Sequence, residues 1–130
     1  MKKSKKKVLL VSALLVVLLL AGVITMHSMV EEVRRLPVSM PRLSNIPDGN
    51  YAGEYAKGPV RVEVEVTVRQ HKITDILIVR HDNGLGGAAE TITETVIREQ
   101  SLEVDAVSGA TVSSKCILKA IENALENADT

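Results

Sequence analysis

Residues 105–114 read Asp-Ala-Val-Ser-Gly-Ala-Thr-Val-Ser-Ser, a run of small and hydroxyl-bearing residues that opens directly into a segment with helical periodicity. The backbone N–H groups in the first turn of a helix lack carbonyl partners and attract anions. Gly109 and Ala110 have little or no side chain, so other groups can approach the backbone closely. This pattern suits a phosphate group. It also suits an ordinary helix cap, in which Ser108 or Thr111 accepts an N–H bond and Gly109 makes the turn.

The remaining candidate residues offer little chemistry. Cys116 is the only cysteine, which excludes an intramolecular disulfide and a thiolate metal cluster, and we expect it to be a packed structural thiol. The three histidines, His27, His71 and His81, are too scattered to predict a metal site, so we expect no metal. The glycine-rich run at residues 81–87 does not have the spacing of a dinucleotide or P-loop fingerprint, and we expect a flexible connection there.

The charge distribution separates the N-terminus from the rest of the chain. Net charge is zero, with 16 basic and 16 acidic residues, but five lysines lie within the first seven positions. The rest of the chain therefore has 11 basic residues against 16 acidic ones. An acidic domain repels phosphate backbones, and two tyrosines with no Phe or Trp offer few surfaces for base stacking. Nucleic-acid binding is not expected.

Residues 8–26 carry no charge and are mostly Leu, Val and Ala, which predicts a transmembrane helix of about the minimum length. The lysine cluster directly before it predicts a single crossing of the cell membrane, with a cytoplasmic N-terminus and the remaining chain extracytoplasmic. A cleaved signal peptide has a similar pattern. We favour an uncleaved anchor because the apolar run is long, residues 25–29 lack a small-x-small cleavage pattern, and Val23 stands where a lipoprotein has its lipidated cysteine.

The segment after the anchor predicts a linker and then a sheet. Residues 27–47 mix charges with three prolines, a composition that opposes a long helix or a strand and suggests a stalk. After a turn at residues 48–50, alternation at 51–55 and strict Val alternation at 60–69 predict two strands. Residues 73–79 predict a third strand, whose apolar run at 76–79 suggests burial on both faces. Short connections favour an antiparallel meander.

Two helices follow the predicted strands. The spacing of Ala88, Ala89, Ile92 and Val96 predicts an amphipathic helix that ends near Gln100. A longer stripe predicts the last helix, formed by Ile117, Ala120, Ile121, Ala124 and Leu125. The expected fold class is therefore α+β, a small antiparallel sheet packed with two helices and preceded by one transmembrane helix. The expected segments are a basic terminus (1–7), the membrane helix (8–26), the stalk (27–47) and one domain (48–128).

The pattern Asp105-x-x-Ser-Gly-Ala-Thr with the following Ser113-Ser114 resembles the flavinylation motif of the FMN-binding domain family. This family includes the flavin-bearing subunits of sodium-pumping NADH:quinone oxidoreductase and of the related Rnf complex. The resemblance extends over residues 48–125, including the opening turn at 48–53, the strands at 60–79 and the run at 100–102. Two departures affect turn geometry more than flavinylation: residues 70–71 replace a common turn glycine, and Ser113 stands where threonine is frequent.

The resemblance implies that Thr111 accepts FMN through a phosphoester bond made by a separate FAD-dependent flavin transferase. It implies that the groups around this phosphate come from the neighbouring residues Ser108, Gly109, Ala110, Val112 and Ser113. It also implies that Asp105 helps the transferase to recognise or activate the site. A covalent tether fits a fold with only two tyrosines, because such a fold can stack poorly on a flavin ring.

With this resemblance, we predict a membrane-anchored, extracytoplasmic flavoprotein that carries electrons between redox partner proteins at the membrane. A domain of roughly 80 residues has little space for both a flavin and a specific substrate, so an electron carrier is expected rather than an independent enzyme. Two alternatives remain: an accessory or flavin-sensing domain of a larger respiratory or signalling assembly, and an unflavinylated interaction module.

Overall fold

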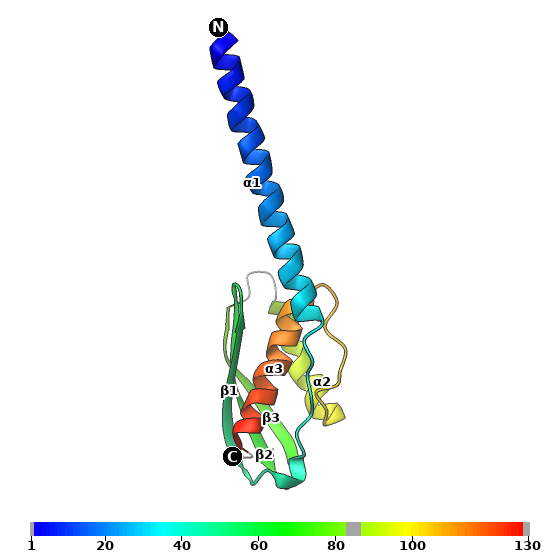
Figure 1. Ribbon diagram of the computed structural model, residues 1–130. Coiled ribbons are helices and arrows are strands. Elements are labelled where there is room, and N and C mark those ends of the chain that lie inside the picture. The colour runs from blue at the N-terminus through cyan, green and yellow to red at the C-terminus, as the bar shows by residue number, and fades with distance from the viewer. Residues whose placement is uncertain (1, 83–86, 129–130) are drawn as a thin grey trace. The chain divides into compact units, whose positions relative to one another are not determined.

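The computed structural model describes residues 2–82 and 87–128. The chain divides into two compact units, Met1–Glu32 and Val33–Thr130. The second unit contains a three-stranded sheet and the helices α2 and α3, which confirms the expected α+β class (Figure 1).

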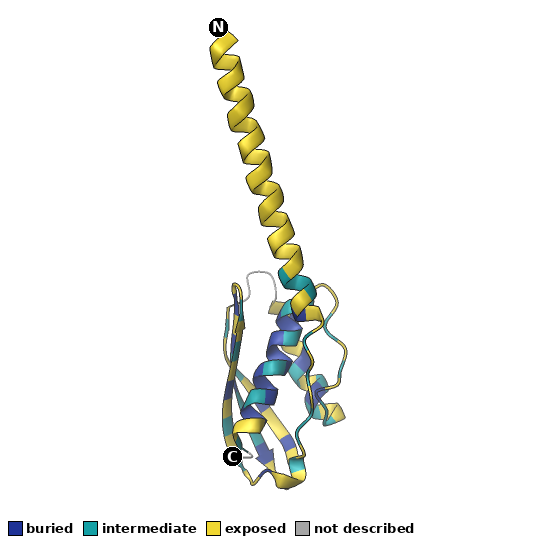
Figure 2. Ribbon diagram, viewed as in Figure 1, coloured by how far each residue is buried: buried dark blue, intermediate teal, exposed yellow. Residues whose placement is uncertain are grey.

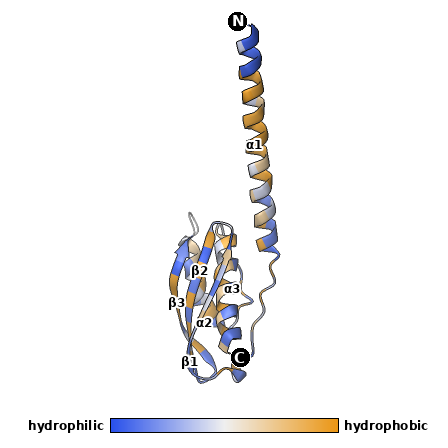
Figure 3. Ribbon diagram, turned by 60° about the vertical axis from the view of Figure 1, so that its left-hand side comes forward, coloured by the Kyte–Doolittle hydropathy of each residue, from blue (hydrophilic) through white to orange (hydrophobic). Residues whose placement is uncertain are grey.

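Helix α1 (Lys2–Arg34) is continuous and forms nearly all of the first unit. Its 33 residues give a length of about 50 Å, and its apolar middle follows a hydrophilic start (Figure 3). By length and composition, it is the one helix in the described part of the chain that could cross a membrane. The helix continues beyond Met26, although the composition of residues 27–47 opposed a long helix. The reason is that Pro37 is the first proline, and the restriction that proline imposes begins only at the residue before it.

The sheet is an antiparallel meander of β1 (Gly49–Lys57), β2 (Val60–Arg69) and β3 (Lys72–Asp82), in the order β1-β2-β3. The predicted alternation of β2 is confirmed. Its buried side chains, all valines, share the face that packs on the helices: Val60, Val62, Val64, Val66 and Val68. The charged residues between them lie on the opposite face.

The turn between β2 and β3 consists of Gln70 and His71, which have φ values of 51° and 61°. Two successive positive φ values are typical of a type I′ hairpin turn, in which glycine is favoured. Here the turn has local support. The Gln70 N–H donates to Asp48 Oδ1 at 2.8 Å, and the His71 ring contacts the Leu43 carbonyl at 3.1 Å. The tight hairpin therefore forms without the glycine that is common at this place.

The prediction that residues 76–79 are buried on both faces is wrong. Ile76 is buried and Ile78 half-buried, but Leu77 is 55% exposed and Val79 is 61% exposed. The reason is that α2 and α3 both pack on the valine face, as the distribution of buried residues in Figure 2 illustrates. Neither of these helices covers the face on which Leu77 and Val79 lie.

The predicted first helix of the domain begins as a 3-10 turn (Gly87–Thr91) and continues as α2 (Ile92–Glu99). It ends at Gln100, which has a left-handed φ of 50°. The Gln100 side-chain amide accepts a bond from the Ile73 N–H at 2.8 Å and donates to the Ile73 carbonyl at 2.7 Å. One side chain thus joins the end of α2 to the outer edge of β3, in the same manner as a neighbouring strand.

Helix α3 (Thr111–Ala128) lies across β1 and β2 (Figure 1). Contact is closest at Gly53, where an added Cβ would lie 2.2 Å from the Ala120 carbonyl oxygen and 2.4 Å from the Ala124 nitrogen. Asn123 then donates from its side chain to the Glu54 carbonyl at 2.8 Å. Since β1 is an edge strand, this bond satisfies a carbonyl that no strand pairs.

Residues 33–47, part of the segment expected to be a stalk, belong to the compact second unit. Val33 and Ile46 are fully buried in its core, and Val38, Met40 and Leu43 pack against that core. Ser39 also donates to the buried carboxylate of Glu122 at 2.8 Å.

Candidate functional site

The chain enters α3 through a tight turn at residues 107–110. The Ala110 N–H donates to the Val107 carbonyl at 3.0 Å, and Gly109 has a φ of +78°. A positive φ at the third position of such a turn is typical of type II and favours glycine. An added Cβ at Gly109 would meet nothing within 4 Å, so the backbone angle, and not lack of space, explains this glycine.

Ser114 connects this turn to the helix. Its hydroxyl accepts the Val107 N–H at 2.9 Å and donates to the Ala110 carbonyl at 2.7 Å. The same carbonyl accepts the Ser114 backbone N–H at 2.9 Å, the first α-helical bond of α3. Ser114 is fully buried, so water does not compete for these bonds. The helix-cap interpretation expected Ser108 or Thr111 to accept an N–H of the first helical turn. The structure shows no such bond in the described residues, and Ser114 instead holds the turn that precedes the helix.

Thr111 is the first residue of α3 and is half-buried. In the described part of the chain, no hydrogen bond involves its hydroxyl. The backbone N–H groups of Thr111, Val112 and Ser113 lie in the first helical turn, where no helix carbonyl can accept from them. Ser108 and Gly109 are exposed beside them. Six of the seven predicted site residues, at positions 108–113, therefore lie in this turn and the start of α3, around the Thr111 hydroxyl.

The electrostatics of this turn favour an anion. The first turn of α3 contains no acidic residue, and the positive end of the helix dipole lies there. Lys115 lies four residues after Thr111, which places both on the same helix face. The sequence analysis missed Lys115, although the i,i+4 spacing from Thr111 is a signal that could have identified it. A free hydroxyl, unpaired amides and a nearby ammonium group are a donor set that fits a phosphate ester on Thr111.

Asp105 lies apart from this donor set. It is exposed and lines an open hollow of about 570 Å³ together with Glu99 and Glu103. Thr111 does not line this hollow. Three carboxylates on one surface repel a phosphate, so the position of Asp105 suits contact with another protein better than contact with the cofactor.

Cys116 lies in the middle of α3 and is fully buried. Burial raises the pKa of its thiol to about 11, so the unreactive thiol form is present at neutral pH. In residues 2–82 and 87–128, no three potential metal ligands gather into a site. Most of the glycine-rich connection, residues 83–86, lies outside the described residues.

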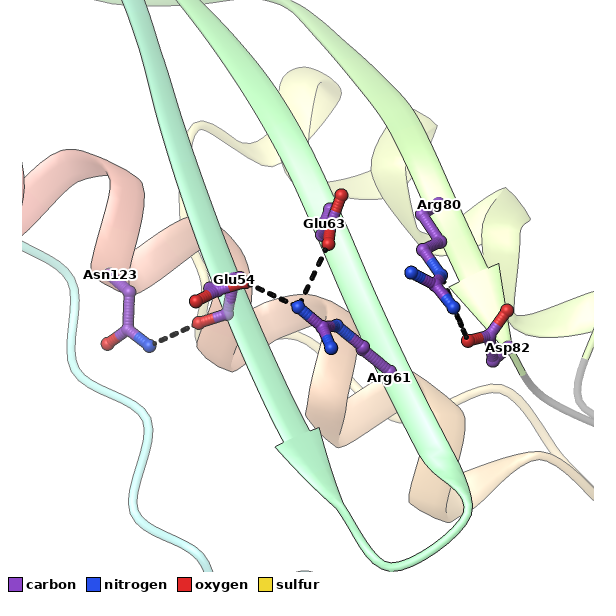
Figure 4. Close-up of polar contacts among 6 residues, drawn as sticks. All are labelled: Glu54, Arg61, Glu63, Arg80, Asp82 and Asn123. Carbon is purple, nitrogen blue, oxygen red and sulfur yellow. Dashed lines mark hydrogen bonds and ion pairs between the residues drawn. The ribbon is translucent and has the colours of Figure 1, made fainter.

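The polar groups on the exposed sheet face form surface ion pairs. Arg61 contacts the carboxylates of Glu54 and Glu63, each at 3.3 Å, and Arg80 contacts Asp82 at 2.8 Å (Figure 4). The hydrogen bond and the charge of Asp82 raise the pKa of Arg80, which keeps this guanidinium charged. These solvated pairs contribute little to stability and arrange no nucleophile or acid–base pair.

Known proteins resemble this chain over more than half of its length. The model of the family described as the FMN-binding domain matches residues 56–126, a range that includes the turn and α3. A relative named NADH:acrylate oxidoreductase, from Vibrio harveyi, is 30% identical over 104 residues, which are 77% of this chain and 10% of that protein. An uncharacterized protein from Treponema pallidum is 27% identical over 105 residues, or 78% of this chain and 29% of the relative. The chain thus spans less than a third of either relative.

Proposed function

Because this chain belongs to the FMN-binding domain family, we propose that it is a membrane-anchored electron carrier whose FMN is bound covalently to Thr111. The observation that carries the proposal is the half-buried Thr111 at the start of α3, whose hydroxyl makes no hydrogen bond in the described residues and lies next to the first-turn amides, on the face that holds Lys115. The chain belongs to a flavin-binding family and is similar to part of a named oxidoreductase, and both findings support a role in electron transfer.

Attachment is a phosphoryl-type transfer from FAD, made by a separate flavin transferase. The Thr111 oxygen forms a bond to the phosphorus of the FMN half as the pyrophosphate bond of FAD breaks, AMP leaves and the hydroxyl proton is released. The first-turn amides and Lys115 stabilise the negative charge of the resulting phosphodiester. Asp105 is the contact for the transferase, since it is exposed and separate from the phosphate-binding groups.

The bound flavin supplies one- or two-electron redox chemistry. The chain contributes a fixed attachment point and few aromatic side chains, namely Tyr51 and Tyr55, both half-buried in β1. Such a scaffold leaves the ring accessible to a partner protein. For this reason we propose an electron carrier and not an enzyme with its own substrate.

Helix α1 is the membrane anchor in this proposal. Its apolar length and the lysines in its first turns support an orientation with the N-terminus in the cytoplasm and the domain outside. Anchoring keeps the flavin near membrane-bound redox partners and so raises its effective concentration. In spheroplasts, added protease should digest the domain and spare an N-terminal tag. The reverse pattern would contradict this orientation.

Intact mass tests the attachment site. The full chain, treated in detergent with a flavin transferase and FAD, should gain the mass of FMN less one water. Thr111→Ala should lose the adduct, and Thr111→Ser should retain part of it because a hydroxyl remains. The control Thr93→Ala, at another half-buried helical threonine, should be modified normally. An adduct that persists in Thr111→Ala, or a wild-type chain that gains no mass, would disprove the assignment.

A further inference from the structure

The proposed function does not explain the side chain of Ser114. This side chain is fully buried, so neither a cofactor nor a transferase can reach it. Its hydroxyl nevertheless makes two hydrogen bonds, to the N–H of Val107 and to the carbonyl of Ala110. These are the first and the last residue of the turn at residues 107–110. One atom therefore fixes both ends of this turn.

We propose that Ser114 is a positioning residue for modification of Thr111, and this inference rests on the proposed function. Thr111 directly follows Ala110, so the direction in which its hydroxyl points depends on how the turn meets the helix. Within the turn, the Ala110 N–H to Val107 carbonyl bond of 3.0 Å is the only backbone bond that joins its two ends. Ser114 adds one bond at each end and keeps Ser108 and Gly109 beside the acceptor.

Loss of this hydroxyl should loosen the turn without removing the acceptor. In Ser114→Ala the Ala110 carbonyl still accepts the Ser114 backbone N–H at 2.9 Å, so the helix still begins at the same place. The Val107 N–H, however, loses its acceptor, and a partly buried donor without a partner favours other conformations of the turn. A nucleophile that spends less time in the reactive orientation reacts more slowly, and small displacements have large effects on rate.

The test measures transferase kinetics on full-length variants in detergent, with FAD as the flavin donor and intact mass as the readout. We expect Ser114→Ala to lower kcat by about tenfold or more while KM changes little, because docking of the transferase does not involve the buried hydroxyl. Ser114→Thr retains a hydroxyl and should recover most of the rate.

Cys116→Ala is the matched control. It removes one buried side-chain atom from the same helix, two residues away, and none of the hydrogen bonds that hold the turn involves that atom. Hydrogen exchange adds a readout that is independent of modification: in Ser114→Ala the Val107 amide should exchange faster, while amides in the middle of α3 remain protected.

Three results would overturn the inference: an unchanged rate in Ser114→Ala, an equal loss of rate in Cys116→Ala, or unchanged exchange at Val107. If the proposed function itself is wrong, the experiment gives a different result. In that case the wild-type chain itself takes up no FMN on Thr111, and no rate remains for Ser114 to influence.

Discussion

The two ends of α3 differ in how the rest of the domain contacts them. The C-terminal part is held against β1 by van der Waals contact at Gly53 and by the side-chain bond from Asn123 to the edge strand. The N-terminal end, in contrast, is half-exposed at Thr111 and Val112 and depends on hydrogen bonds from one serine. One helix thus combines a tightly packed end that stabilises the fold with an accessible end suited to chemistry. Mutations at the two ends should therefore have separable effects.

The largest effect on stability is expected at Gly53, on the packed side. In Gly53→Ala the new methyl group overlaps the backbone of α3 at Ala120 and Ala124, which cannot move away as a flexible side chain would. Overpacking of this kind should lower the free energy of unfolding by about 3 kcal/mol. The free energy of unfolding is measured by urea titration, with circular dichroism as the signal. Gly87→Ala is the control, because a Cβ there meets nothing within 4 Å. Equal stability of the two variants would show that contact at Gly53 is not tight.

A pH-dependent effect is expected at Cys116, which lies between the two ends. Its folded pKa is raised to about 11 from an ordinary value of 9.0. The thiol of the unfolded chain therefore ionises at a lower pH than the thiol of the folded chain. The contribution of Cys116 to the free energy of unfolding is complete below pH 9 and is lost as the pH rises toward 11. The loss is at most about 2.7 kcal/mol over this window.

The Cys116 effect is measured as the difference in urea-unfolding free energy between the wild-type chain and Cys116→Ala, which share all other titrating groups. This difference should shrink between about pH 8.5 and about pH 10.5, each roughly half a unit below one of the two pKa values. A constant difference would mean that the thiol is accessible to solvent and that the middle of α3 is less tightly packed.

The smallest effect is expected at Asn123. In Asn123→Ala the Glu54 carbonyl loses a bond of 2.8 Å but remains at an exposed edge, where water can replace the donor. We expect a loss of about 1 kcal/mol in unfolding free energy, with flavin attachment at Thr111 unaffected. Glu126→Ala, an exposed position on the same helix, is the control. A lower yield of the flavin adduct in Asn123→Ala would show that the two ends of α3 are coupled.

Local sequence patterns predicted most of the secondary structure. The valine alternation identified the buried face of β2, and the apolar stripe identified α3, because each pattern depends on geometry within one element. The hydroxyl-rich run similarly identified the start of α3 as the candidate site. Lys115 was not predicted because the hydroxyl-rich run ends at Ser114, whereas Lys115 lies one helical turn after Thr111.

The prediction that failed concerns what covers a surface. An apolar run such as residues 76–79 shows that the strand could be buried on both faces. It does not show whether other elements of the chain cover both faces of the sheet. In the structure α2 and α3 pack on one face, so Leu77 and Val79 stay exposed. The prolines suggested a stalk at residues 27–47, and within that range the structure buries Val33 and Ile46 in the core of the second unit.

The sequence by itself determined the class of the fold, the helix suited to a membrane, and the hydroxyl that accepts the cofactor in our proposal. These features follow from periodicity, composition and the order of neighbouring residues. Only the tertiary structure decided that Gln100 joins α2 to the edge of β3, that α3 touches β1 at a glycine, and that Ser114 holds the turn before Thr111. The physical reason is that these contacts depend on distances and directions between separate segments, which no spacing along the chain records.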